Sequence, residues 1–204
     1  MDAVKQIYTF SRKDLPSDSK VTPIISKEST EWISKFPSGS QLFISALGTT
    51  RGNAGGFENQ RKIDYDLNLS MAKAAKDAGS KVYVLISSSG ANSKSALGYP
   101  KMKGELEDAV QELGFDNVVI LRPGLIVGNR QESRMAEGVF RKIAGFAGSV
   151  SGNALKDFWA QDDVVIARAA VKAGLDAVEG KATDKVKILG QSDIVRLGRT
   201  EWKD

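Results

Sequence analysis

The stretch KVYVLISSSGANSKSALGYPKMK, residues 81–103, decides the fold class of this 204-residue chain. Its opening run, Lys81–Ile86, is apolar after the first residue, as in a strand that is buried on both faces. Ser87–Ala96 follows as a loop of small residues. Tyr99–Leu113 then has helical spacing, and Gly114 stands where a helix commonly ends. The stretch therefore predicts a strand, a loop and a helix, in that order.

The same alternation continues on both sides of this stretch. Further strands are predicted at Val4–Phe10, Val21–Ile25, Gln41–Leu47, Val118–Leu121 and Val186–Leu189. Further helices are predicted at Glu28–Phe36, Phe57–Ala78, Met135–Phe146 and Asp162–Val178, with a chain break at Pro123–Gly128. Gln41–Leu47 contains no charged residue, so we expect it in the centre of the sheet, buried on both faces. Strands that alternate with helices predict an α/β fold, a parallel sheet with helices on both faces.

The composition narrows the possible chemistry. Hydrophobic residues make up 41% and charged residues 26% of the chain, as is usual for a globular protein. The length predicts a single domain over residues 1–204. The chain has no Cys and no His, which excludes thiol nucleophiles and Ser-His-Asp hydrolysis and removes the usual zinc ligands. We therefore expect no metal site, and acid–base chemistry by Tyr, Lys, Asp or Glu.

Charge and hydropathy bear on partners and location. The net charge is +4, and the charges are scattered singly, so we expect no nucleic-acid binding. No segment approaches the ~18 apolar residues that a membrane-spanning helix needs. The N-terminal MDAVKQIYTF has neither the apolar core of a secretory signal nor the pattern of a transit peptide.

The residues with the clearest chemistry are Tyr99 and Lys103, four positions apart at the start of a predicted helix and therefore on one helix face. A Lys ammonium one turn away is expected to lower the pKa of the Tyr phenol, which allows proton transfer with a substrate oxygen. One of the serines Ser87–Ser89, at the carboxyl end of the preceding strand, can hydrogen-bond the same oxygen. The alternatives are a surface Tyr beside a surface Lys, and serines that serve only the turn before Gly90.

Other candidates follow the remaining predicted strands, because ligands of such sheets bind beyond the carboxyl ends of the strands. Arg12 and Lys13 suit the 2′-phosphate of NADP, with a solvated basic loop as the alternative. The small residues Gly48–Gly52 permit close approach to a cofactor. Pro123 turns the chain after another strand. Asp64, Asp66 and Asn68 lie on a predicted helix, where capping or surface roles are expected.

Six motifs together resemble the short-chain dehydrogenase/reductase superfamily. More narrowly, the chain resembles its atypical fungal members associated with the mitochondrial outer membrane, whose animal relative is the HIV Tat-interacting oxidoreductase. The motifs are LGTTRGNAGG (Leu47–Gly56), KIDYDLN (Lys62–Asn68), SSSGA (Ser87–Ala91), YPKMKGELE (Tyr99–Glu107), RPGLIVGNRQESR (Arg122–Arg134) and DIVRLGRTEWK (Asp193–Lys203). The last two are specific to this small family.

The resemblance implies a Rossmann-like doubly wound sheet, NADP(H) binding, and hydride transfer to or from a carbonyl or alcohol substrate. It implies that Tyr99 exchanges the proton, and that Lys103 lowers the pKa of Tyr99 and binds ribose. Ser88 is the best match for the catalytic hydroxyl, and Ser89 is the next best. The implied cofactor-binding residues are Arg12, Lys13, Leu47, Gly48, Thr49, Tyr99, Lys103, Pro123, Ile126 and Arg134. Residues 129–163 are expected to form a lid on the substrate side. The implied location is the mitochondrial outer membrane, peripherally attached, with the cytoplasm as the alternative.

One departure from the family concerns the N-terminus. Members begin with a strand and a Gly-rich phosphate-binding turn, whereas this sequence begins at the family's next strand, and no Gly-rich turn opens a helix before Gly39. We therefore expect a Rossmann-like sheet that lacks the first βα unit, from a naturally short gene product or an incomplete gene model, and weak cofactor binding. The second hypothesis is a non-catalytic scaffold that binds protein partners at the mitochondrial surface.

Overall fold

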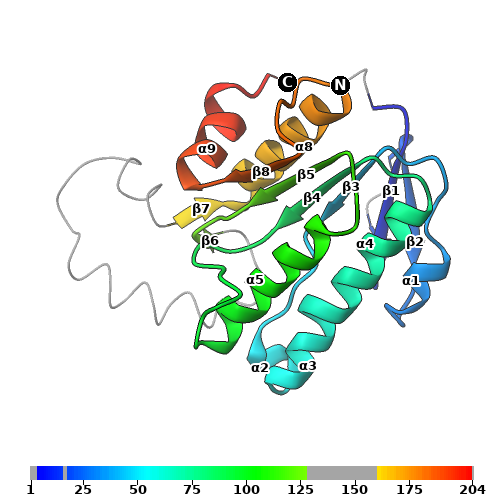
Figure 1. The fold of residues 1–204 in the computed structure, drawn as a ribbon. Coiled ribbons are helices and arrows are strands. Elements are labelled where there is room, and N and C mark those ends of the chain that lie inside the picture. The colour runs from blue at the N-terminus through cyan, green and yellow to red at the C-terminus, as the bar shows by residue number, and fades with distance from the viewer. Residues whose placement is uncertain (1–3, 16–17, 128–159, 204) are drawn as a thin grey trace.

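A computed structural model describes residues 4–15, 18–127 and 160–203. Its centre is a sheet of four parallel strands in the order β3-β4-β5-β8 (Figure 1). The strands are β3 (Leu42–Ser45), β4 (Val82–Ile86), β5 (Asn117–Leu121) and β8 (Val186–Leu189). Parallel neighbours need crossover connections, and helices supply them here. The α/β class and the parallel, Rossmann-like sheet are thereby confirmed.

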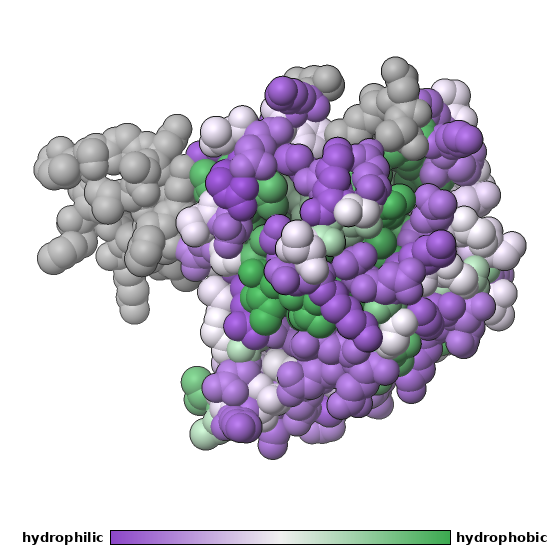
Figure 2. Space-filling view, turned by 45° about the horizontal axis from the view of Figure 1, so that its top comes forward, coloured by the Kyte–Doolittle hydropathy of each residue, from purple (hydrophilic) through white to green (hydrophobic). Residues whose placement is uncertain are grey.

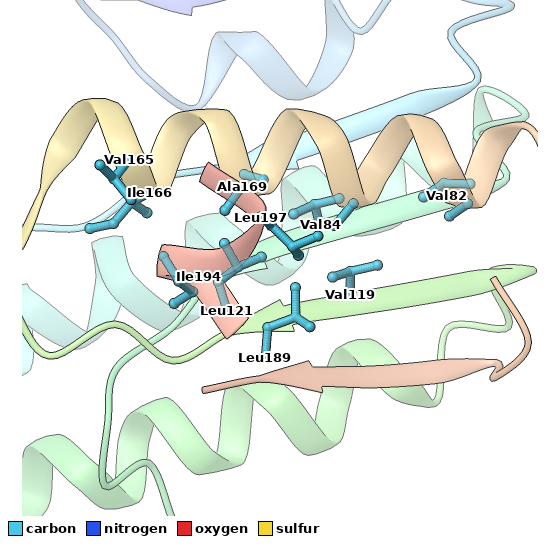
Figure 3. Packing of buried hydrophobic residues seen from close by; sticks show 13 residues of the cluster. Val82, Val84, Val119, Leu121, Val165, Ile166, Ala169, Leu189, Ile194 and Leu197 are labelled. Carbon is cyan, nitrogen blue, oxygen red and sulfur yellow. The ribbon is translucent and has the colours of Figure 1, made fainter. Parts of the chain in front are cut away.

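Helices cover both faces of this sheet, as the alternation predicts. On one face, α8 (Asp163–Val178) lies over the strands, and valines from β4 and β5 point toward it (Figure 3). A Cβ added to Gly174 of α8 would lie 2.9 Å from a Leu42 methyl carbon, so this glycine lets helix and strand approach closely. Two short segments, α9 (Gln191–Val195) and the π-helix η2 (Arg196–Thr200), complete this layer and contribute Ile194 and Leu197.

The opposite face is covered by α5 (Gly98–Gln111) and by a long helical run, Phe57–Asp77. That run consists of α3 (Phe57–Arg61), a π-helical turn η1 (Lys62–Leu67) and α4 (Asn68–Asp77). Alternate residues of β4, Tyr83 and Leu85, pack on this side with Leu106 and Phe115. Both helices end near a glycine with positive φ, Gly79 (φ 93°) and Gly114 (φ 76°), as the sequence predicts.

The first two strands form a separate two-stranded parallel sheet, β1 (Ile7–Ser11) and β2 (Val21–Ile25). Aromatic rings join this sheet to the main one: Phe36 stacks on Phe10 at 5.3 Å and meets Phe43 of β3 edge-on at 5.2 Å. Trp32, from the short helix α1 (Glu31–Ser34), is buried in the same cluster. A further short helix, α2 (Arg51–Ala54), follows β3.

Two expectations about the sheet are wrong. Gln41–Leu47 is not central: β3 is paired only with β4 among the described strands, and three of its four residues are half-buried. The segment nevertheless contains no charged residue, because both faces of β3 are covered: Leu42 and Ile44 face α8, and Phe43 packs in the aromatic cluster. Pro123–Gly128 is not merely a break, because β6 (Leu125–Val127) pairs in parallel with β7 (Ala160–Asp162).

The predicted lid and the helix Met135–Phe146 lie almost wholly outside the described residues. Of residues 129–163, the structure describes only the last four, which form β7 and the first residue of α8. The face seen in Figure 2 is mainly hydrophilic, with hydrophobic residues reaching the surface in patches. No helix in the described ranges is long and apolar enough to cross a membrane.

Candidate active site

The candidate site forms where the chain leaves β4 and β5. The two strands stay paired beyond their ends, because Ser87 N donates to Leu121 O at 2.7 Å and Ser89 N donates to Pro123 O at 2.8 Å. Ser88 is thereby held beside Pro123 at the carboxyl edge of the sheet. The structure thus brings together two residues that the sequence assigned to catalysis and to cofactor binding.

The loop after Ser89 is pinned against α5, which fixes where that helix begins. Asn92 N donates to Pro100 O at 3.0 Å. A Cβ on Gly104 would lie 2.1 Å from Ser93 N, so only a glycine permits this contact between helix and loop. Tyr99 and Lys103 consequently lie on the first turns of α5, close to the serine loop.

Tyr99 differs from expectation in one respect. Ser88 lies close enough to the Tyr99 phenol to affect its pKa as a hydrogen-bonding neighbour. Although 42% of the Tyr99 surface is exposed, its pKa is raised above the ordinary value, chiefly because the part of the chain packed around it removes water and to a smaller extent by the charge of Asp64, while Ser88 lowers it. The expectation that Lys103 lowers the pKa of Tyr99 is therefore wrong for the chain without a bound cofactor. The physical reason is that loss of water disfavours the charged phenolate, and that the nearby charge acting on it is the negative charge of Asp64.

Lys103 is buried, with only 3% of its surface exposed. Its Nζ donates to Ile86 O at 3.4 Å, at the end of β4. Burial lowers the pKa of Lys103, and the carboxylates of Asp64 and Glu107 raise it. An ammonium has three N–H donors, and the bond to Ile86 uses one of them. The remaining donors suit the hydroxyl groups of a ribose, so this side chain fits the implied cofactor.

A buried polar stripe on the long helical run holds the loop after β3. Gln60 Nε2 donates to Thr49 O at 3.1 Å, Asp64 Oδ1 accepts from Thr49 N at 2.7 Å, and Asn68 Nδ2 donates to Leu47 O at 3.2 Å. The expected capping or surface roles are wrong for Asp64 and Asn68, which are 2% and 0% exposed. Asp66 is exposed, as expected.

The π-helical turn accounts for the alignment of this stripe. An α-helix has 3.6 residues per turn, so side chains four apart drift around its axis. A π turn closes i→i+5 hydrogen bonds and holds more residues, which offsets the drift. Gln60, Asp64 and Asn68 therefore share one face across η1. Their four-residue spacing is the sequence signal that could have identified them.

A second buried network lies behind the serine loop. Glu107, 2% exposed, accepts from Ser87 Oγ at 2.5 Å and from Arg122 Nη2 at 2.5 Å. Arg122 Nε donates to both carboxylate oxygens, at 3.1 and 3.2 Å. One side chain of α5 thus ties together the ends of β4 and β5. The Ser87 hydroxyl is bound to Glu107 at 2.5 Å, whereas the Ser88 hydroxyl donates to Ser89 O over a longer distance of 3.3 Å, so Ser88 is the easier of the two to turn toward a substrate.

The other candidates are placed less centrally. Arg12 and Lys13 are exposed and follow β1, in the two-stranded sheet, so they lie on a different sheet from the Ser–Tyr–Lys group. Gly48 and Thr49 follow β3 and are linked to that group through Asp64. Ile126 is exposed on β6. Arg134 lies outside the described residues. Within the described part, no three His, Cys, Asp or Glu residues group as metal ligands do.

Comparison with solved structures supports the fold. MoeE5 in complex with UDP-glucose and NAD superposes with a TM-score of 0.65 at 14% identity, covering 93% of this chain and 68% of that one. UDP-glucose 4-epimerase from Thermotoga maritima gives 0.61 at 10% identity, covering 96% and 74%. The class that these comparisons define is a protein with a Rossmann-like α/β fold, in which Ser88, Tyr99 and Lys103 lie at the carboxyl edge of the sheet.

Sequence comparison gives the family. The HIM1 family model matches residues 19–144. The protein fmp52, mitochondrial, of Aspergillus clavatus is 53% identical over 208 residues, covering 96% of this chain and 88% of the relative. The fmp-52 protein of Neurospora crassa is 42% identical, covering 98% and 86%. The chain therefore belongs to the HIM1 family, together with these fungal proteins named as mitochondrial.

Proposed function

We propose that the chain is an NADP(H)-dependent oxidoreductase that interconverts a carbonyl and an alcohol. The observation that carries this proposal is the grouping of Ser88, Tyr99 and a buried Lys103 where β4 leaves the sheet. Support also comes from the fold, since solved proteins that share it include complexes named with NAD. A bound nicotinamide would supply or accept the hydride.

The residues of this chain supply the proton and the orientation. Because burial raises the pKa of Tyr99, the phenol is protonated near neutral pH and is ready to give its proton to a carbonyl oxygen. Ser88 donates to the same oxygen and holds it in place. Lys103 binds the ribose hydroxyls and brings positive charge to the phenolate that remains. In this protonated form the site can act as the acid in the carbonyl-reducing direction.

A comparison of the affinities for NADPH and NADH tests directly whether the chain binds the cofactor as proposed. We expect NADPH to bind more tightly than NADH, because Arg12 and Lys13 follow β1 and can pair with a 2′-phosphate. The measurement is a fluorescence titration of each reduced cofactor. Arg12→Ala should remove the preference, while Arg196→Ala, which breaks an exposed ion pair elsewhere, should leave it unchanged. Equal affinities in the unmutated protein would refute the assignment.

The proposed location is the mitochondrial surface, with peripheral attachment. It is supported by the names of the fungal relatives, which are called mitochondrial. We expect carbonate or high-salt washing of isolated mitochondria to release the chain, because peripheral proteins are held by contacts that these treatments weaken. Immunoblotting of pellet and supernatant measures the release. Retention through both treatments would show that the attachment is of another kind.

A further inference from the structure

One face of the two-stranded sheet carries exposed apolar side chains. Phe10 of β1 and Ile24 of β2 are paired in register and pack in the aromatic cluster on one side of this sheet. Successive side chains of a strand point to opposite faces, so Ile7 and Ile25 lie on the other side, where they are 41% and 42% exposed. We call this side the outer face, and its residues are Ile7, Thr9, Ser11, Val21, Pro23 and Ile25.

Basic residues lie at both ends of the outer face. Lys5 and Lys20 come just before the paired strands β1 and β2, and all their side-chain neighbours in this list are exposed as they are. Arg12, Lys13 and Lys27 come just after the same strands. The segment from Lys5 to Lys27 has five basic and two acidic residues, so it carries +3 of the chain's net charge of +4. The pairing of the two strands therefore gathers charges that are scattered along the sequence.

These charges are available to a partner. Among the described residues, no ion pair is formed by Lys5, Arg12, Lys13 or Lys27. An exposed apolar patch with a polar rim marks contact with a protein or a membrane. The six residues of the outer face are far fewer than the roughly 20–30 on each side of a stable protein interface. A bilayer needs no matched shape, and anionic lipids attract basic side chains. The outer face therefore fits an anionic membrane surface.

We propose that the outer face binds the surface of a bilayer that contains anionic lipids. Ile7 and Ile25 enter the boundary between headgroups and acyl chains, and the lysines at both ends of the face reach the lipid phosphates. The proposal names the partner in the peripheral attachment proposed above, and it rests on that attachment for its biological meaning. The Ser–Tyr–Lys group belongs to the main sheet and α5, so the membrane-binding face and the candidate active site are separate.

Sedimentation of the whole chain with vesicles tests the proposal. The probes are vesicles of phosphatidylcholine with about 30% phosphatidylserine, and neutral vesicles of phosphatidylcholine alone. We expect the chain to sediment with the anionic vesicles only, and added salt to release it, because salt screens exposed charges. Lys5→Glu together with Lys27→Glu should weaken the binding about tenfold or more. Ile7→Ser together with Ile25→Ser should weaken it by a similar factor, because less apolar surface leaves water.

Matched controls lie on the far side of the main sheet from β1 and β2, at β8 (Figure 1). Lys185→Glu together with Lys187→Glu changes the net charge by the same amount, also at exposed positions. Ile188→Ser is the apolar control, since Ile188 is 47% exposed on this strand. Both controls should bind anionic vesicles as the unmutated protein does. Circular dichroism of each variant checks that its fold is kept.

Equal sedimentation with anionic and neutral vesicles would overturn the proposal, and so would equal losses of binding in the Lys5/Lys27 variant and its control. If the Ile7/Ile25 variant does not fold, the exposed lysines still decide. Size-exclusion chromatography tests the other occupant. A dimer of the unmutated protein that the Ile7/Ile25 change dissociates would assign the outer face to a second copy of the chain, and would overturn the proposal as well.

The vesicles contain no cofactor and no mitochondrial protein, which separates this proposal from the proposed function. Failure to bind them leaves the oxidoreductase activity standing, together with attachment to mitochondria through a protein. A chain that binds anionic vesicles and is absent from mitochondrial pellets refutes only the proposed location. Absence of turnover leaves the membrane-binding face standing.

Discussion

Tyr99→Phe is expected to lower the turnover of a carbonyl substrate by roughly 10²–10⁴-fold, the usual contribution of a positioned acid or base. The substitution removes one hydroxyl and keeps the ring, so fold and cofactor affinity should persist. With no His and no Cys in the chain, few other groups can give a proton near neutral pH. The measurement is the steady-state oxidation of NADPH with 4-nitrobenzaldehyde as the probe carbonyl.

Tyr8→Phe is the matched control for this experiment. Tyr8 has 41% of its surface exposed and Tyr99 has 42%, but Tyr8 lies on β1, in the two-stranded sheet. Removal of the Tyr8 hydroxyl should leave turnover unchanged. Lys103→Ala should reduce both turnover and cofactor binding, since its ammonium serves both. If Tyr99→Phe keeps full activity, the Ser–Tyr–Lys assignment is wrong, and the scaffold hypothesis, binding of protein partners without catalysis, takes its place.

Arg122→Ala is expected to lower the free energy of unfolding by about 3 kcal/mol, the lower part of the ~3–5 kcal/mol range for breaking a buried pair. In the variant, the carboxylate of Glu107, 2% exposed, keeps Ser87 as its hydrogen-bonding partner among the described residues and loses its ion-pair partner. The lower value is expected because Arg122 itself is 33% exposed, so water reaches one side of the pair. Urea unfolding at neutral pH is the measurement.

Arg196→Ala again provides the control. Arg196 pairs with Asp193 and Glu201 at the surface, and exposed ion pairs contribute at most about 1 kcal/mol. The double variant Arg122→Met with Glu107→Gln should recover part of the lost stability, because it no longer buries an unpaired charge. Equal losses for Arg122→Ala and Arg196→Ala would show that the Glu107 network does not hold β4, β5 and α5 together.

Local patterns predicted the elements well where each could be recognised within its own segment. The apolar run Lys81–Ile86 became β4, and Val186–Leu189 became β8 at the predicted residues. The Tyr99/Lys103 spacing placed both residues on the first turns of α5. Apolar content did not predict order in the sheet, as β3 demonstrates, because an edge strand with both faces covered has the composition of a central one.

The site required contacts between segments far apart in the chain. In the sequence, Asp64 and Glu107 look like ordinary exposed acids on helices. Only tertiary packing buries them, Asp64 against Thr49 and Glu107 against Ser87 and Arg122. The direction of the Tyr99 pKa was likewise missed, because spacing shows a neighbouring charge and does not show loss of water.

The sequence by itself thus determined the α/β alternation and the serine, tyrosine and lysine that follow β4, because periodicity and short spacings are local properties of the chain. The tertiary structure alone decided which strand lies at the edge of the sheet, which carboxylates are buried and which form Tyr99 favours. These depend on desolvation and on long-range pairing, which arise only when distant segments pack together.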